Sequence, residues 1–554
     1  MESWLLLLLI IILTLFLSFL FKSNNQKKVP PGPSAFSVIS SFLRANADIE
    51  LILRDLKTKY GPVFNFRIGL GFRRPSIYVA SHSLAYQALV KQGAIYSDRP
   101  KASLTLPSSR INMASSPYGP TWRLLRRNLV SEMLHPSRTK SYSKVLSRVL
   151  SILIQQLRAD SAATEVITLI DQFRYAMFYL LVLMCFGDKI DEPQVKQIQD
   201  VQRRWILTLG RFINLSFFPT SLQKIIFRNQ WKELIQMIQE QERVFIPLIE
   251  ARMKAKTEEG MVAYKDTLLN LEFPEEKRKF NHGEIVSLCS EFLTGGTDTT
   301  STSLQWIMAN LVKYPSIQEK LYQEISDVVN KGNSKPKEVK EEDLQKMPYL
   351  KAVILEGLRR HPPGHFLQPH AVTEEVELNG YVIPKDATIT FMVADMNLDP
   401  NVWENPLDFK PDRFLSVDGD TEAFDITGNR EIKMMPFGAG RRMCPGYGLA
   451  MFHMEYFVAN LIWHFEWKAV DGDDIDLSEK LEFAVTMKNP LRARIRPRQA
   501  QIGKFMLQPV QFHLSNQYAA RFHCYLEMQQ AKRGSELRSG HDETRNIRIH
   551  KEVI

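Results

Sequence analysis

The chain has 554 residues, of which 44% are apolar, 24% charged and 10% aromatic, values close to the average for folded globular proteins. This composition excludes an intrinsically disordered, collagen-like or low-complexity chain. The formal net charge of +10 is carried by dispersed Lys and Arg residues, so we expect no nucleic-acid partner. An anionic membrane surface or an acidic protein partner fits this charge better.

The four cysteines show neither metal-ligand spacing nor a disulfide framework. A reducing, cytosol-facing compartment is therefore expected. They are Cys185, Cys289, Cys444 and Cys524.

The amino terminus predicts a membrane anchor. Trp4 to Phe21 is an uncharged run of 18 residues. As a helix it would span about 27 Å, enough for one crossing of a bilayer. Lysines follow the run, so the positive-inside rule leaves the rest of the chain on the cytosolic side; a cleaved signal peptide is the alternative. We assign residues 1–22 to the anchor and the basic, proline-rich residues 23–34 to a hinge.

After the hinge, the sequence predicts a mainly α protein with a smaller β portion. Alternating apolar residues between Gly61 and Ser81 predict strands, and Asn379-Gly380 between short apolar runs predicts a hairpin. Nearly everything from Ser83 to Asn330 shows helical spacing. The apolar stretch from Leu207 to Phe227 is either a core helix or a lip that rests in the bilayer.

A long helix is predicted from a capping box at Asn281-His282-Gly283-Glu284 to about Lys313. Its middle reads Gly295-Gly296-Thr297-Asp298-Thr299-Thr300, and each glycine there costs a helix roughly 1 kcal/mol. Two explanations stay open. The glycines allow close helix packing, or they mark a local opening that admits a small ligand, with Asp298 and Thr299 handling protons through water.

An acid and a base three residues apart, Glu356 and Arg359, share one face of another predicted helix. A surface ion pair of little energetic worth is the default interpretation. Arg413, farther along the chain, could join the pair in a buried network.

The most specific motif is Phe437-Gly438-Ala439-Gly440-Arg441-Arg442-Met443-Cys444-Pro445-Gly446. Pro445 suits a first helical turn, so Cys444 is expected at a helix start, where the pKa of its thiol should fall. The glycines would let a flat ligand approach the backbone, and Arg442 could meet an anionic group. Alone, Cys444 would be interpreted as a small buried hydrophobe.

These motifs, in this order and at these separations, resemble the cytochrome P450 family. The resemblance covers roughly Pro30 to Pro497 and extends to the plant microsomal members, with a long-helix region similar to plant family eighty-nine. It implies the cytochrome P450 fold, mainly α with a smaller β portion, over residues 35–497, preceded by one N-terminal transmembrane helix.

The resemblance also implies roles for individual residues. Cys444 would be the axial thiolate ligand of the iron of heme b, and Asp298 and Thr299 would deliver protons, as the catalytic pair. Glu356, Arg359 and Arg413 would form a structural network behind the heme. Gly295 and Gly296 would make the oxygen groove, and the expected partners of the heme propionates are Trp122, Arg126, His370, Arg442 and, less directly, Arg99.

The implied reaction is insertion of one atom of dioxygen into a lipophilic small molecule, with electrons from NADPH through NADPH-cytochrome P450 reductase. Arg123, Arg126, Arg127 and Arg441 could help dock that reductase, or form an ordinary solvated basic face. The implied location is the endoplasmic reticulum membrane, as a single-pass protein facing the cytosol. The pocket would be lined by Leu104–Tyr118, Leu207–Phe218, Ser290–Thr299, Gly364–Gln368 and Ala484–Met487, with His365 and Gln368 as polar exceptions.

Two other functions stay open. A heme-thiolate isomerase or dehydratase would rearrange peroxides without reductase, although the intact Asp298-Thr299 pair argues against it. A catalytically impaired membrane heme-binding protein is the non-enzymatic alternative.

Residues 498–554 have no counterpart in the resemblance. This tail carries four histidines and Cys524, but at irregular spacings. We interpret it as a disordered appendage or a gene-model artefact, with a Cys/His metal site as the alternative, and assign it no function.

Overall fold

A computed structural model describes residues 29–33, 48–66, 75–100, 110–213, 227–254, 261–330, 338–416, 424–472 and 474–498, all within the compact unit Met1–Ala500. The expected anchor and most of the hinge and tail lie outside these residues. Within the described ranges, no helix is both long and apolar enough to cross a membrane.

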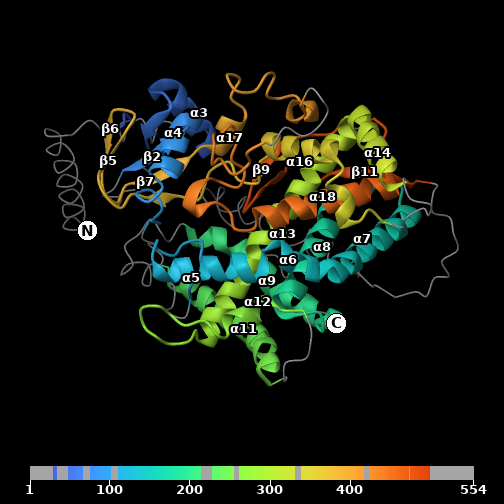
Figure 1. Cartoon of the computed structure of the whole chain (residues 1–554), viewed down its shortest axis with the longest axis horizontal. Coiled ribbons are helices and arrows are strands. Elements are labelled where there is room, and N and C mark those ends of the chain that lie inside the picture. Colours follow the sequence, from blue (N-terminus) through green and yellow to red (C-terminus); the bar gives the residue numbers. More distant parts are fainter. Residues whose placement is uncertain are drawn as a thin grey trace, which may run out of the picture. The chain divides into compact units, whose positions relative to one another are not determined.

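Helices make up most of the described chain, which confirms the mainly α prediction (Figure 1). They are α3 (Ile49–Tyr60), α4 (His82–Tyr86), α5 (Pro120–Asn128), α6 (Pro136–Thr139), α7 (Ser143–Ala163), α8 (Ile170–Phe186), α9 (Glu192–Ile213), α11 (Arg228–Lys254), α12 (Tyr264–Leu268), α13 (His282–Lys313), α14 (Pro315–Val329), α15 (Glu341–Leu344), α16 (Pro348–Arg360), α17 (Val393–Asn397) and α18 (Tyr447–His464).

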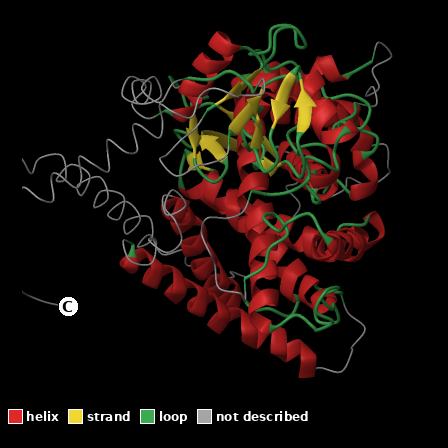
Figure 2. Cartoon of the chain, turned by 90° about the vertical axis from the view of Figure 1, so that its left-hand side faces the viewer, coloured by secondary structure: helices red, strands yellow, loops and turns green. Residues whose placement is uncertain are grey.

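The described strands form four small sheets (Figure 2), and β8, β10 and β11 contact the large helices α7, α13 and α18. The largest sheet has the order β1-β2-β7-β4, with β2 and β7 parallel in the register Ile77 opposite Ile389. A second sheet has the order β3-β11-β8, and β5 with β6 and β9 with β10 form two-stranded pairs. The bounds are β1 Val63–Asn65, β2 Ser76–Val79, β3 Ile167–Thr168, β4 His370–Ala371, β5 Val376–Leu378, β6 Tyr381–Ile383, β7 Thr388–Phe391, β8 Phe465–Lys468, β9 Glu479–Leu481, β10 Val485–Met487 and β11 Arg492–Pro497.

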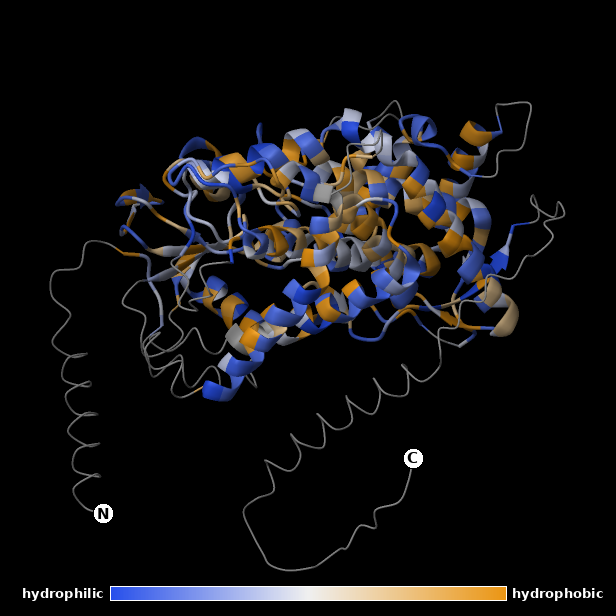
Figure 3. Cartoon of the chain, turned by 90° about the horizontal axis from the view of Figure 1, so that it is seen from below, coloured by the Kyte–Doolittle hydropathy of each residue, from blue (hydrophilic) through white to orange (hydrophobic). Residues whose placement is uncertain are grey.

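Helix α13 is the long helix that the sequence predicts, and it runs through the centre of the unit (Figure 1). The side chain of Asn281 accepts a hydrogen bond from the backbone of Glu284, whose carboxylate accepts one from the backbone of Asn281, so the predicted capping box forms. The helix packs against α8, α11, α16 and α18, and its buried residues join the largest apolar core. Hydrophobic colour is concentrated in the interior ribbons (Figure 3).

The local turn predictions are also confirmed. Strands β1 and β2 lie between Gly61 and Ser81, and the predicted hairpin is β5 and β6. Asn379 and Gly380 have φ of 55° and 73°, the left-handed conformation that such a two-residue turn requires. The apolar stretch after Leu207 begins within α9, and Leu207 is exposed. Its residues 214–226 lie outside the described chain, so both explanations of that stretch stay predictions.

Candidate functional site

The loop before α18 holds Cys444 through its own backbone. The Cys444 amide donates to the carbonyl of Phe437 at 2.8 Å. Gly440 has a φ of 68°, and a Cβ there would lie 2.0 Å from the carbonyl oxygen of Leu89. The glycine at this position is therefore needed for the loop to pack against the chain around Leu89.

Two details of this loop correct the sequence prediction. The helix begins at Tyr447 with Gly446 as its N-cap, so Cys444 precedes it and does not occupy its first turn. Burial raises the pKa of the Cys444 thiol, although the backbone N–H of Gly446 and the nearby Arg126 act in the opposite direction. The predicted fall in pKa was wrong because the sequence does not show the desolvation of the sulfur by the folded chain. A thiolate here needs a stronger positive partner, such as a metal cation.

Three guanidinium groups surround the cysteine loop. Arg126 donates to the carbonyl of Met443 at 2.5 Å. Arg442 donates to the carbonyls of Ser97 and Ser116 at 2.7 Å each. Arg99 donates to the carbonyl of Ala114 at 2.8 Å and to those of Gln368 and Pro369 at 2.9 Å each.

Burial lowers the pKa of Arg99 and of Arg442 to about 10 each, and in the case of Arg99 the charge of Arg442 adds to the effect. Asp98 is the carboxylate that acts on both of these arginines. One acid near three bases leaves an excess of positive charge, which suits an anionic ligand.

The two predicted aromatic partners lie in the same region. Trp122, on α5, is buried, and the guanidinium of Arg442 lies 4.5 Å from its ring centre. His370, on β4, is also buried, with Nδ1 at 2.7 Å from the carbonyl oxygen of Tyr96. Burial, together with Arg99 and Arg442, lowers the pKa of His370 to about 3, so its ring is neutral. A carboxylate beside His370 would raise the pKa of its ring. It would also accept a hydrogen bond from the ring N–H.

Helix α13 is continuous through its two glycines, and open space borders one of them. The hydroxyl of Thr299 donates to the carbonyl of Gly295 at 2.7 Å. Gly295 is exposed although it lies in the middle of a central helix, and a Cβ there would meet no atom within 4 Å. Gly296 is different, because a Cβ there would lie 2.8 Å from Leu181 of α8. Each explanation thus applies to one glycine: Gly296 permits close packing, and Gly295 borders open space.

The side chain of Asp298 has different partners from that of Thr299. Its Oδ1 lies 3.2 Å from Nε of Arg174 on α8 and 3.5 Å from Nη1 of Arg203 on α9. The carboxylate is buried, so these two arginines supply the charge partners that burial requires. The sequence prediction included Asp298 but missed both arginines.

The predicted acid-base network forms behind the cysteine loop. Arg359 makes a bidentate pair with Glu356 at 2.7 and 2.9 Å, and Nε of Arg413 lies 3.2 Å from the same carboxylate. Glu356 and Arg359 have no exposed surface. The default surface ion pair is therefore excluded.

Sequence reasoning missed Glu291, which lies on α13 one turn before Gly295. Its carboxylate accepts the backbone N–H groups of Met113 and Ala114 at 2.7 Å each. Burial raises the pKa of Glu291 to about 7, although both hydrogen bonds oppose the shift. The available signal was a lone acid in an otherwise apolar stretch of the long helix.

The two polar exceptions of the expected pocket have partners of their own. His365 is buried between Glu50 and Glu479, with Nε2 3.3 Å from the latter. The side-chain oxygen of Gln368 accepts a hydrogen bond from Arg99 at 3.2 Å. Of the pocket ranges, residues 104–109 and 214–218 lie outside the described chain.

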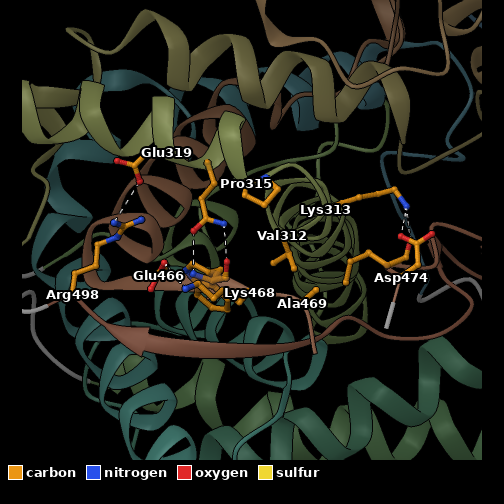
Figure 4. A pocket seen from close by; sticks show the side chains of 12 residues that line it. Val312, Lys313, Pro315, Glu319, Glu466, Lys468, Ala469, Asp474 and Arg498 are labelled. Atoms are coloured by element: carbon orange, nitrogen blue, oxygen red, sulfur yellow. Dashed lines mark hydrogen bonds and ion pairs between the residues drawn. The ribbon is translucent and has the colours of Figure 1, made fainter. Parts of the chain in front are cut away.

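A surface hollow of about 510 Å³ lies where α13 meets α14, beside β8 (Figure 4). Its charges are paired across its walls: Nζ of Lys313 lies 2.8 Å from Asp474, and Nη1 of Arg498 lies 3.9 Å from Glu319. None of the residues that line it belongs to the cysteine loop or to residues 295–299 of α13.

These residues fit a heme. The described part of the chain has no cluster of three or more His, Cys, Asp or Glu side chains able to hold a metal ion, so an iron would depend on Cys444 and on ligands from outside the protein. The surplus of guanidinium groups fits the two carboxylates of a heme.

The chain belongs to the cytochrome P450 family, whose profile matches residues 30–495. It is 48% identical to cytochrome P450 89A9 of Arabidopsis thaliana over 503 residues, covering 88% of this chain and 96% of that protein. This confirms the predicted resemblance to plant family eighty-nine. It is also 29% identical to geraniol 8-hydroxylase of Catharanthus roseus, over 88% of this chain and 97% of that protein.

A solved structure of a zebra fish cytochrome P450 with progesterone shows the same fold. It superimposes with a TM-score of 0.67 at 22% identity, over 81% of this chain and 99% of that chain. The family and fold establish a cytochrome P450 monooxygenase that uses heme with cysteine thiolate ligation.

Proposed function

We propose that this monooxygenase inserts one oxygen atom into a lipophilic small molecule bound beside Gly295, and that its electrons come from NADPH through NADPH-cytochrome P450 reductase. The observation that carries the proposal is the open space at Gly295, with the Thr299 hydroxyl on the carbonyl of the same residue. A hydroxyl so placed can hold and pass a proton beside this open space.

Each group of residues has its own task. Cys444 would hold the iron, and Arg99, Arg126 and Arg442 would bind the carboxylates. When bound, the heme supplies reductive activation of dioxygen and transfer of one oxygen atom to the substrate. Asp298, the second member of the proposed catalytic pair, is held by Arg174 and Arg203 and would act with Thr299 through water.

The substrate class follows from the walls of this space, which we call the substrate chamber. Gly295 has no side chain, and Ala484 to Met487 around β10, which the family resemblance places at the pocket, are small or mostly apolar. Such walls favour a lipophilic molecule with few charges. The hydroxylase named among the relatives supports a plant hydroxylation of this kind.

The test is turnover of candidate lipophilic substrates by full-length protein reconstituted with NADPH and reductase under ¹⁸O₂. We expect one labelled oxygen atom per product molecule. In Thr299→Ala, product formed per NADPH consumed is expected to fall about tenfold, because the hydroxyl that holds the proton is lost. Thr267→Ala, a hydroxyl on α12 that bonds Asn128, is the matched control.

The result separates the alternatives. Product without ¹⁸O and without NADPH would support the isomerase or dehydratase, and a heme spectrum without any product would support the impaired heme-binding protein. Unchanged coupling in Thr299→Ala would remove Thr299 from proton delivery.

The reductase would dock on the basic surface near the cysteine loop. Arg123, Arg127 and Arg441 are exposed there, whereas Arg126 is bonded to Met443. Three exposed guanidinium groups suit an acidic partner surface.

We also propose that residues 1–22 anchor the protein in the endoplasmic reticulum membrane with the catalytic domain in the cytosol. The uncharged run followed by lysines supports this location. Deletion of residues 2–28 is expected to release the protein from sedimented membranes at high salt while leaving its heme spectrum unchanged. Retention of the truncated protein in the membrane fraction, or loss of its heme in a folded state, would contradict the separation of anchor and domain.

A further inference from the structure

Glu291 and Gly295 lie four residues apart and therefore share one face of α13. Gly295 borders the substrate chamber. Glu291 keeps part of its surface accessible. Its helical spacing places it on the same side of α13 as Gly295, one turn earlier.

The partner of Glu291 is the loop at residues 110–118, which precedes α5. Both carboxylate oxygens are used, because Oε2 accepts the Met113 N–H and Oε1 the Ala114 N–H, at 2.7 Å each. Both N–H donors favour the ionised form of Glu291, and hydrogen bonds to an ionised acceptor are about twice as strong as neutral ones. The side chains of Met113 and Ala114 form no hydrogen bond with Glu291. The contact therefore involves only the backbone of the loop.

The same loop is held from two other sides. Arg442 donates to the carbonyls of Met113 and Ser116, and Arg99 donates to that of Ala114. At its start, Nη2 of Arg110 donates to Gln241 of α11 at 2.5 Å. The loop therefore lies between the arginines around the cysteine loop and the acid of α13. Of these contacts, only those of Glu291 join the loop directly to α13, the helix that carries Gly295.

We propose that Glu291 is a positioning residue that holds the loop at residues 110–118 as a wall of the substrate chamber and so limits the size of ligand the chamber accepts. This inference rests on the proposed function, because it assumes that ligands bind beside Gly295. Glu291 touches neither iron ligand nor proton donor in this role. Its effect passes through the position of Met113 and Ala114.

The test uses Glu291→Gln in the full-length heme protein, with pyridine and 3-phenylpyridine as probes. Both probes bind heme iron through nitrogen and shift its absorbance. A glutamine can accept from only one of the two amides and turns a donor toward the other, so one charge-assisted hydrogen bond is lost. We expect the ratio of the two dissociation constants to move about tenfold in favour of 3-phenylpyridine, as the wall loosens.

Backbone hydrogen exchange gives a second measurement that does not depend on heme. Exchange of the peptide covering residues 110–118 is expected to be about tenfold faster in Glu291→Gln, because the loop opens more often. Ala114→Pro removes one of the two N–H donors and leaves the carboxylate in place. It should shift the probe ratio in the same direction, and the double variant should add little, since both changes break one contact.

Glu324 supplies the matched control. It accepts the backbone N–H groups of Tyr349 and Leu350 at 2.7 and 2.8 Å, the same chemistry at the junction of α14 and α16. Glu324→Gln should leave both the probe ratio and exchange at residues 110–118 unchanged. An unchanged ratio in Glu291→Gln, or an equal shift in Glu324→Gln, would overturn the inference.

The two proposals fail in different ways. If wild-type protein lacks a thiolate-type carbon monoxide spectrum or NADPH-dependent turnover, the proposed function fails. If wild-type protein turns over and Glu291→Gln leaves the probe ratio unchanged, the inference about Glu291 fails alone.

Discussion

Cys444→Ser is expected to abolish both the thiolate-type Soret band of the reduced carbon monoxide complex and NADPH-dependent product formation. The other two described cysteines, Cys185 and Cys289, are buried on α8 and α13, so neither belongs to the loop that holds Cys444. A serine hydroxyl would fit the space, but its oxygen does not ionise at neutral pH and donates far less electron density to iron. The loop itself should persist, because the amide of residue 444 still donates to Phe437.

Cys289→Ser is the matched control for this substitution. Cys289 is a buried cysteine on α13 that forms no disulfide. Its thiol is hydrogen-bonded to Cys185, not to the cysteine loop. The same change of sulfur to oxygen should therefore keep the Soret band per molecule of heme. A thiolate-type band that survives in Cys444→Ser would show that the iron has another ligand.

The sequence was most informative where function depends on consecutive residues. The cysteine loop, the glycine pair and the capping box of α13 are all local patterns, and the structure forms each of them. The pairing of Glu356 with Arg359 is local as well, at a spacing of three residues on α16. Arg413 was named as a possible third member before the family resemblance, which then implied the same network, and the structure pairs it with Glu356.

The missing parts are side chains brought together by packing. Arg174 and Arg203 reach Asp298 from α8 and α9, and Met113 reaches Glu291 from a loop 178 residues away in sequence. No local pattern marks such pairs. The pKa of Cys444 was mispredicted for a related reason, since burial is a property of the folded chain and outweighs the helix end that the sequence shows.

The arginines divide into two sets by what they bond. Arg99, Arg126 and Arg442 bond backbone carbonyls around the cysteine loop and keep their charge available to an anion. Arg359 and Arg413 instead share an ion pair with the Glu356 carboxylate. Loss of a residue from the first set should therefore affect heme loading, whereas loss from the second should affect folding itself.

Glu356→Ala is accordingly expected to destabilise the fold by about 3–5 kcal/mol, the usual cost of leaving one member of a buried pair without its partner. Arg359 would keep the carbonyls of Asn397 and Pro406 as acceptors but would lose its only bonded carboxylate among the described residues. The free energy of unfolding can be measured by urea denaturation in detergent micelles, followed by tryptophan fluorescence. Trp403, 5.3 Å from the guanidinium of Arg359, reports on the site directly.

Glu132→Ala serves as the control for this prediction. Glu132 and Arg138 form an ion pair at 3.1 Å between side chains that are 39% and 43% exposed. Exposed pairs contribute about 0–1 kcal/mol, so its loss should change the free energy of unfolding little. Equal effects of the two substitutions would mean that burial does not govern the Glu356 pair, and that the contacts of Arg359 with backbone carbonyls are enough to hold its charge.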